Sequence, residues 1–204
     1  MKLKIHDLTF EISFPLTAAM TLVILCDTSL SAAVCFIAII IHESGHLLAL
    51  HHYSSFPSRI KLTLFDFAIC DKKKNVRCLR QELVIILAGV SANMLFFLLT
   101  MGINFFFPHI FWEMLMNANL TLAVFNSLPV ESLDGGQAVF LLLCKKADPK
   151  NAVKILEIIS FVVLLPIAAL GFLVLLRSKY NFSLLLTAIY LIASILLSKS
   201  KICY

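Results

Sequence analysis

Apolar stretches long enough to cross a lipid bilayer occupy most of this chain. A helix needs about 20 predominantly apolar residues to span the hydrocarbon core. Six stretches approach that length, roughly over residues 12–26, 30–53, 83–107, 110–144, 155–176 and 182–197. The fourth is interrupted by a segment that contains proline and glycine. The expected fold class is therefore an all-α polytopic membrane protein with about six transmembrane helices.

The amino-acid composition excludes an ordinary soluble domain. Of the 204 residues, 60% are hydrophobic and 14% are charged, and the mean hydropathy is +0.95. Soluble domains carry roughly a quarter charged residues. The formal net charge of +5 would suggest nucleic acid for a soluble protein. Here the basic residues lie in short connections between apolar stretches, so no nucleic-acid partner is expected.

The distribution of Lys and Arg predicts the membrane topology of the chain. Basic residues gather at both termini, in the connection 54–82 and in the turn 145–150, whereas the connections around Asp27 and Pro108 have none. Cytoplasmic loops of membrane proteins are enriched in Lys and Arg. We therefore expect a multi-pass protein of the cell membrane with both termini in the cytoplasm, and only the basic residues at 177–179 oppose this topology.

The N-terminus and the cysteines carry no signal for processing or cross-linking. Residues 1–11 lack the apolar region of a cleavable signal peptide. The six cysteines form no C-x-x-C pair, so we expect neither a disulfide framework nor a cysteine zinc site.

The connection between the second and third stretches has a β-like segment. Residues 59–67 alternate polar and apolar side chains over much of their length, which is the period of a strand. An extended edge at the membrane surface could pair with the backbone of a substrate. A small hairpin that packs on the helix ends is the other interpretation.

The second apolar stretch contains an H-E-x-x-H motif, His42-Glu43-Ser44-Gly45-His46. Residues i and i+4 share one face of a helix, so both histidines can bind one zinc ion at about 2.0–2.1 Å. Glu43 is offset by about 100° and reaches the water on the metal, whose proton it can accept during hydrolysis. Two core histidines and a surface glutamate are the alternative, but such residues inside an apolar span are costly and functional by default.

A catalytic zinc ion commonly has three protein ligands, so a third is needed. The other acidic residues near the membrane interior are Glu113, Glu131, Asp134 and Glu157. Asp134 stands out because Pro129 before it and paired glycines after it break helical structure. An unwound segment at membrane depth is tolerated where it lines a water-containing cavity. In the predicted topology Asp134 and the histidine pair lie toward the same end of their spans.

The H-E-S-G-H motif and the later L-D-G-G segment that contains Asp134 together resemble the site-2 protease family of intramembrane zinc metalloproteases. The resemblance implies that His42, His46 and Asp134 bind zinc and that Glu43 is the catalytic base. It covers about residues 5–144.

Shorter matches imply substrate-binding residues. Asn126 and Pro129 match the N-x-x-P element that precedes L-D-G in this family, and Asn93 ends a segment that resembles its A-G-P-x-x-N element. For Asn93, a hydrogen bond between helices is the alternative. The chain departs from the family at Val90, where proline is usual, and at 131–132, where the stretch is normally apolar. These departures bear on loop geometry and on substrate preference.

The resemblance also organises the chain. We expect a single intramembrane metalloprotease domain over 1–204, with a catalytic core at about 30–144 and accessory spans at about 152–199. The early H-E-x-x-H and the lack of a PDZ insertion resemble the sporulation branch, which processes a precursor sigma factor. The CBS domain that usually ends that branch has no counterpart in this sequence.

The expected function is that of an intramembrane zinc metalloendopeptidase, with access to the active site from the cytoplasmic side. Its expected partners are the lipid bilayer, a membrane-embedded or membrane-tethered protein substrate, and a regulatory membrane protein. Two alternatives belong to other classes. A pseudoprotease would bind client helices without cutting them, and a metal transporter would need a polar path along several helices, which the last two apolar stretches do not offer.

Overall fold

The computed structural model describes residues 2–5, 8–12, 27, 30–53, 59–62, 67–70, 77–178 and 183–198. The chain separates into two compact units, Met1–Ala123 and Val124–Tyr204. The first apolar stretch, predicted at 12–26, lies outside the described residues except at Ile12, so its structure is left as a prediction.

The first unit holds three helices, α2 (Ser31–His52), α3 (Leu79–Phe106) and most of α4 (Ile110–Asn126). The start of α2 is fixed by Asp27, whose carboxylate accepts hydrogen bonds from the Ala32 N–H at 2.6 Å and from the Ser31 hydroxyl at 3.2 Å. An acidic side chain satisfies the unpaired N–H groups of a first turn in this way.

Small residues let α2 and α3 pack closely against each other. A Cβ atom placed on Gly45 of α2 would lie 2.5 Å from the Ala88 carbonyl oxygen and 2.8 Å from Ala92 Cβ, both on α3. A larger residue at position 45 would therefore force the two helices apart, because real Cβ atoms do not approach other atoms so closely. Such small-residue contacts are how membrane helices associate without a hydrophobic driving force.

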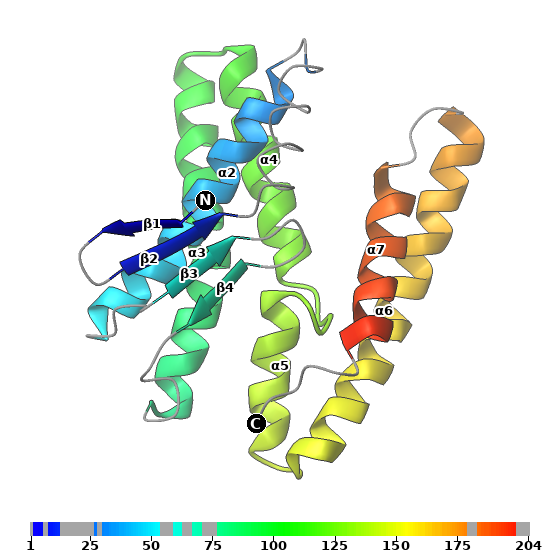
Figure 1. Ribbon diagram of the computed structural model, residues 1–204. Coiled ribbons are helices and arrows are strands. Elements are labelled where there is room, and N and C mark those ends of the chain that lie inside the picture. Colours follow the sequence, from blue (N-terminus) through cyan, green and yellow to red (C-terminus); the bar gives the residue numbers. More distant parts are fainter. Residues whose placement is uncertain are drawn as a thin grey trace. The chain divides into compact units, whose positions relative to one another are not determined.

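The first unit also contains a four-stranded sheet in the order β1-β2-β3-β4, drawn in dark blue to teal in Figure 1. Its strands are β1 (Lys2–Ile5), β2 (Leu8–Ile12), β3 (Arg59–Leu62) and β4 (Phe67–Cys70). Strands β3 and β4 form an antiparallel hairpin, so the predicted β-like segment at 59–67 begins in a hairpin, while its packing on the helix ends stays a prediction. Pairing of the sheet with a substrate is untested.

The N-terminal hairpin was not predicted from the sequence. Strands β1 and β2 pair antiparallel, and β2 pairs parallel with β3, for example Thr9 with Arg59. An isolated two-stranded hairpin is marginal in water. The N-terminal hairpin is therefore stabilised by its pairing with β3, which follows it in the sequence only after α2. Local sequence patterns do not reveal a pairing over such a separation.

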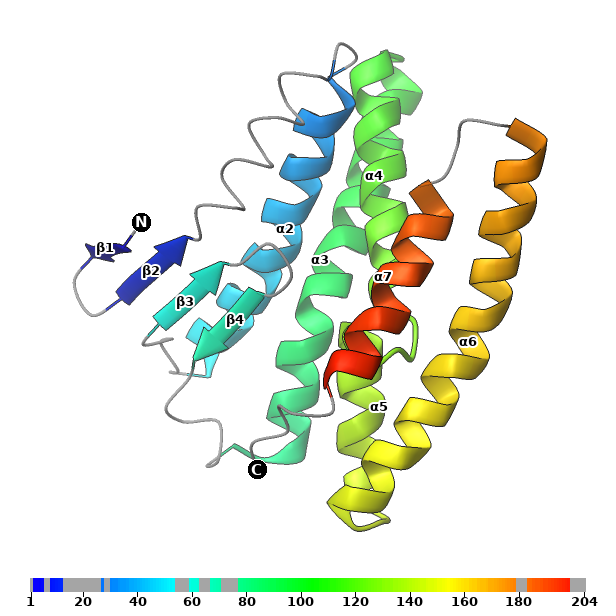
Figure 2. The same ribbon diagram turned by 45° about the vertical axis from the view of Figure 1, so that its right-hand side comes forward.

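The second unit consists of α5 (Asp134–Cys144), α6 (Pro149–Ser178) and α7 (Ser183–Ser198). Helix α6 packs against both α5 and α7, and α6 and α7 lie side by side in Figure 2. Helix α6 continues through Pro166. The buried core of this unit joins the segment before α5 to these helices through Val130, Leu164, Leu191 and Ile195.

Three described helices, α2, α3 and α6, are long and apolar enough to cross a membrane. Only 28%, 22% and 17% of their most apolar windows are buried inside the protein, so most of these apolar side chains need a lipid environment. Helices α4, α5 and α7 have 17, 11 and 16 residues and fall below that length. The helical membrane fold is confirmed, while the count of six spans and the cytoplasmic termini stay predictions.

Candidate metal centre

The two histidines of the H-E-x-x-H motif face each other on α2. Their Nε2 atoms are 3.2 Å apart, and the rings meet edge to face with centroids 4.9 Å apart and planes at 79°. His42 is buried, 6% exposed, and His46 is half-buried. The i, i+4 spacing therefore brings two imidazole nitrogens to one point on a helix in an apolar environment.

A backbone carbonyl orients the His46 ring. His46 Nδ1 lies 2.8 Å from the carbonyl oxygen of Ile85 on α3. A carbonyl oxygen can only accept, so the hydrogen of this bond sits on Nδ1. In the neutral ring that leaves the lone pair of Nε2 free to bind a metal, which is the usual arrangement for histidine ligands.

The spacing of the two nitrogens fits a shared zinc ion. Two imidazole ligands at about 2.0–2.1 Å from a tetrahedral zinc ion are roughly 3.3–3.4 Å apart. The observed 3.2 Å between the Nε2 atoms differs from that value by only about 0.1–0.2 Å. Without a metal, one Nε2–H would donate to the other nitrogen over the same distance.

Gly89 of α3 leaves space beside these nitrogens. A Cβ atom at Gly89 would overlap His46 Nε2 and would lie 2.8 Å from His42 Nε2. Glycine is thus required at position 89 for α3 to lie this close to the two rings. The contrast is Gly102 on the same helix, where a Cβ atom would meet nothing within 4 Å.

The acidic residue between the two histidines is Glu43. Its side chain is half-buried, and its Oε2 atom is buried. The neighbouring Ser44 hydroxyl donates to the Ile40 carbonyl oxygen of its own helix at 2.6 Å, so it is engaged within α2. Glu43 is the acidic side chain of α2 next to the imidazole pair.

Asp134 is the first residue of α5, in the second unit. It follows the break at 127–133, where the backbone makes its own turns: the Val130 N–H donates to Leu128 O at 2.8 Å and the Leu133 N–H to Val130 O at 2.8 Å. Local bonds of this kind make an unwound segment affordable in a membrane protein. Asp134 is half-buried, its Oδ2 atom is buried, and the N–H groups of a helix start favour a carboxylate there.

The break is held in place from two sides within the second unit. On α5, the paired glycines lie against its backbone: a Cβ atom on Gly135 would overlap Ser127 O, and one on Gly136 would overlap Val130 O. On α6, the buried Ser160 hydroxyl accepts from the Glu131 N–H at 3.0 Å and donates to the Pro129 carbonyl oxygen at 3.4 Å. These contacts hold the segment that leads to Asp134 in place within the second unit.

The remaining predicted site residues lie on several elements. Asn93 is on the same face of α3 one turn after Gly89, is fully buried, and has neither side-chain polar atom hydrogen-bonded to a described residue. Asn126 ends α4, and Pro129 lies in the break. Asn93 and the histidine pair belong to the first unit, and Asn126, Pro129 and Asp134 to the second.

Sequence reasoning did not identify Ile85, Ser160 or Asn119. The contribution of Ile85 is a backbone carbonyl, which has no signature in the sequence. Ser160 and Asn119 are both fully buried, and a polar residue within an apolar stretch was the available signal. The Asn119 side-chain N–H donates to Leu115 O at 2.8 Å within α4.

Comparison with known proteins identifies the fold. No protein-family model and no curated protein sequence matches the chain. Among solved structures, the chain has the fold of a protease. That protein is the site-2 protease from Methanocaldococcus jannaschii, with a TM-score of 0.71, 21% sequence identity, and coverage of 100% of this chain and 96% of that chain. At this identity the match shows a shared fold, and it agrees with the resemblance inferred from the motifs.

Proposed function

We propose that the protein is an intramembrane zinc metalloendopeptidase of the site-2 protease type. It hydrolyses peptide bonds of membrane-embedded or membrane-tethered proteins. The observation that carries the proposal is the imidazole pair of α2, with Nε2 atoms 3.2 Å apart and the His46 ring oriented by Ile85 O. The shared fold with a site-2 protease supports the same function.

The proposed zinc ligands are His42, His46 and Asp134. They would supply two imidazoles from the first unit and one carboxylate from the second. This donor set suits zinc, and three protein ligands leave one position for water or substrate, as in other catalytic zinc sites. The apolar surroundings strengthen the electrostatic contribution of such a site.

The chemistry follows from the position of Glu43 beside the pair. A zinc ion, when bound, polarises the scissile carbonyl and acidifies water. Glu43 accepts a proton from the attacking water as its oxygen forms a bond to the carbonyl carbon. As the C–N bond breaks, Glu43 returns the proton to the leaving amine nitrogen.

Other residues would hold the substrate. We propose that Asn93, Asn126 and Pro129 line the path of an extended substrate segment, which must unwind because a helical amide is occupied by its own hydrogen bonds. The buried side chain of Asn93 has donor and acceptor atoms that a substrate backbone could satisfy. Substrate and water would enter from the cytoplasmic side, and a regulatory membrane protein could act there.

The proposal is tested with purified protein in detergent and a panel of single-span substrates. We expect the wild type to cut at least one substrate. Glu43→Gln keeps the size of the side chain and the metal ligands but removes the base, so it should keep its zinc and lose about 10²–10⁴-fold in rate.

Two other outcomes point to other functions. Stoichiometric zinc without turnover across the whole panel would favour a pseudoprotease that binds client helices. Zinc flux into vesicles reconstituted with the wild-type protein would favour a transporter.

A further inference from the structure

A pocket of about 130 Å³ opens between α5 and α6 in the second unit. Its lining residues are Glu131, Gln137, Phe140, Val153 and Leu156. An engineered apolar cavity of about 150 Å³ holds a benzene molecule, whereas small-molecule sites measure about 300–1,000 Å³. The pocket therefore has room for a single side chain and is too small for an ordinary small-molecule ligand.

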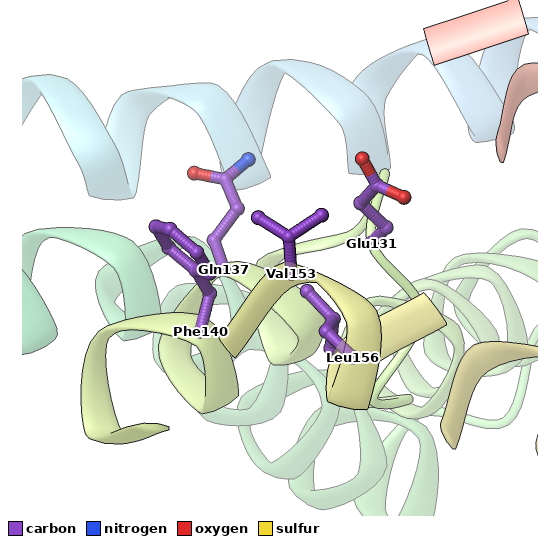
Figure 3. A pocket seen from close by; sticks show the side chains of 5 residues that line it. All are labelled: Glu131, Gln137, Phe140, Val153 and Leu156. Atoms are coloured by element: carbon purple, nitrogen blue, oxygen red, sulfur yellow. The ribbon is translucent and has the colours of Figure 1, made fainter. Parts of the chain in front are cut away.

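Apolar walls and a polar edge give the pocket a defined chemistry. Phe140 and Leu156 supply aromatic and aliphatic surface, and Val153 lies between the two polar residues. Figure 3 shows the carboxylate of Glu131 and the amide of Gln137 pointing to the same side, on either side of Val153. A side chain that enters this pocket would thus contact apolar walls, with one carboxylate and one amide at the edge.

The pocket adjoins the proposed zinc ligand along the chain. Glu131 precedes Asp134 by three residues, and Gln137 follows it by three, almost one helical turn into α5. Three residues of extended chain span at most about 11 Å. A substrate whose scissile bond lies at the metal held by Asp134 would therefore reach this pocket with a side chain no more than about three substrate residues from that bond.

The position of the Glu131 backbone is fixed. Its N–H donates to the buried Ser160 hydroxyl on α6 at 3.0 Å. On the other side, a Cβ atom on Gly136 would lie 2.8 Å from the Glu131 nitrogen, so α5 packs directly against this backbone. Because the backbone of Glu131 cannot shift, its carboxylate stays at the edge of the pocket and favours side chains whose charge matches it.

These observations specify the occupant. A neutral apolar side chain would pack on the apolar walls but would gain nothing from the negative charge of Glu131 at the edge of the pocket. An acidic side chain would be repelled. Lysine and arginine bury a long aliphatic stem along apolar surface and keep the cation at the end, where it can pair with the Glu131 carboxylate.

We propose that this pocket is a specificity subsite that binds a basic side chain of the substrate, close to the cleavage position. The inference rests on the proposed protease function. It also gives a role to the acidic residue at 131, where the resemblance led us to expect an apolar one.

The test measures binding, so that it does not depend on hydrolysis. Fluorescent single-span Leu/Ala peptides carry one Lys, Met or Glu at stepped positions, and their dissociation constants are measured with protein in lipid nanodiscs. For the wild type we expect the Lys peptide to bind about tenfold more tightly than the Met peptide at one or two adjacent positions. Glu131→Gln should abolish this preference, and Glu131→Lys should shift it to the Glu peptide.

Glu113→Gln is the matched control, because Glu113 is an exposed carboxylate on α4, and it should keep the wild-type preference. Helix content and melting temperature are compared for all variants. The subsite is contradicted if the wild type shows no Lys preference at any position, or if Glu131→Gln retains it. Binding with the expected preference but without cleavage by the wild type would count against the protease function and leave the subsite standing.

Discussion

At the scale of residues, both ring nitrogens of His46 have a defined role. Nδ1 donates to Ile85 O, and Nε2 faces His42 Nε2 beside Gly89. The carbonyl of α3 selects the tautomer, and the missing side chain at 89 avoids a clash with the two Nε2 atoms that we propose as metal ligands. The proposed metal binding by α2 should therefore depend on its contact with α3.

The contact at Gly89 leads to the first prediction. In Gly89→Ala the added methyl group overlaps His46 Nε2, so the rings must turn away and the bond to Ile85 O must weaken. Changes to groups that orient a metal ligand typically cost about 10–100-fold in affinity. We expect a zinc affinity reduced by that factor, measured by competition with a chelator.

The control for this experiment is Gly102→Ala, which adds a methyl group to the same helix in open space. It should keep the wild-type zinc affinity. Equal affinities of the two variants would contradict the assigned role of Gly89.

The sequence was informative about side chains that only a few residue types can supply, such as an imidazole or a carboxylate. His42, Glu43 and His46 follow from their spacing alone, and the structure brings the two histidines together as expected. The Ile85 carbonyl could not be predicted, because any residue supplies one and only the packing of α3 on α2 decides which carbonyl is close. The zinc site itself, with Asp134, stays a prediction.

At the scale of elements, the break between α4 and α5 is the most constrained segment of the second unit. Proline and the paired glycines predicted it, and the helices indeed end at Asn126 and resume at Asp134. The hydrogen bonds from Ser160 on α6 could not be predicted, since they join residues about 30 positions apart. For the same reason, the parallel pairing of β2 with β3 was missed.

The second prediction concerns Ser160→Ala. This change leaves the Glu131 N–H without its acceptor in a buried position and the Pro129 carbonyl oxygen without its donor. An unsatisfied buried group costs about 1–3 kcal/mol. We expect a loss of that size in the free energy of unfolding in detergent, together with weaker zinc binding, because the segment leading to Asp134 loosens.

Ser91→Ala serves as the comparison, since the exposed Ser91 hydroxyl only donates to Leu87 O of its own helix at 2.9 Å. Its unfolding free energy should change by less than about 0.5 kcal/mol. If the two serine variants are equally stable, Ser160 does not hold the break.

At the scale of the whole molecule, the exposed apolar surface calls for a membrane. Side chains such as Leu98, Phe105, Val162 and Leu165 are half or more exposed on α3 and α6, and these helices are long enough to span a bilayer. The composition correctly predicted helices in a membrane, because helices surrounded by lipid need apolar residues on every side. The orientation in the membrane rests only on the placement of Lys and Arg.

The third prediction tests that orientation. A reporter that is active only in the cytoplasm, fused after Lys201, should be active, because basic residues gather at both termini. The same reporter inserted at Pro108, in a connection without Lys or Arg, should be inactive. The reverse pattern would contradict the proposed access to the site from the cytoplasm.

The central claim is that His42, His46 and Asp134 hold one zinc ion, and X-ray absorption at the zinc edge combined with the metal content per chain tests it most directly. We predict one zinc ion with two imidazole nitrogens and oxygen ligands at about 2.0–2.2 Å in the wild type. Asp134→Ala should lose zinc or part of its oxygen shell, while Asp148→Ala, at an exposed aspartate, should match the wild type. An unchanged zinc content and ligand shell in Asp134→Ala, or a wild-type spectrum without imidazole, would contradict the account.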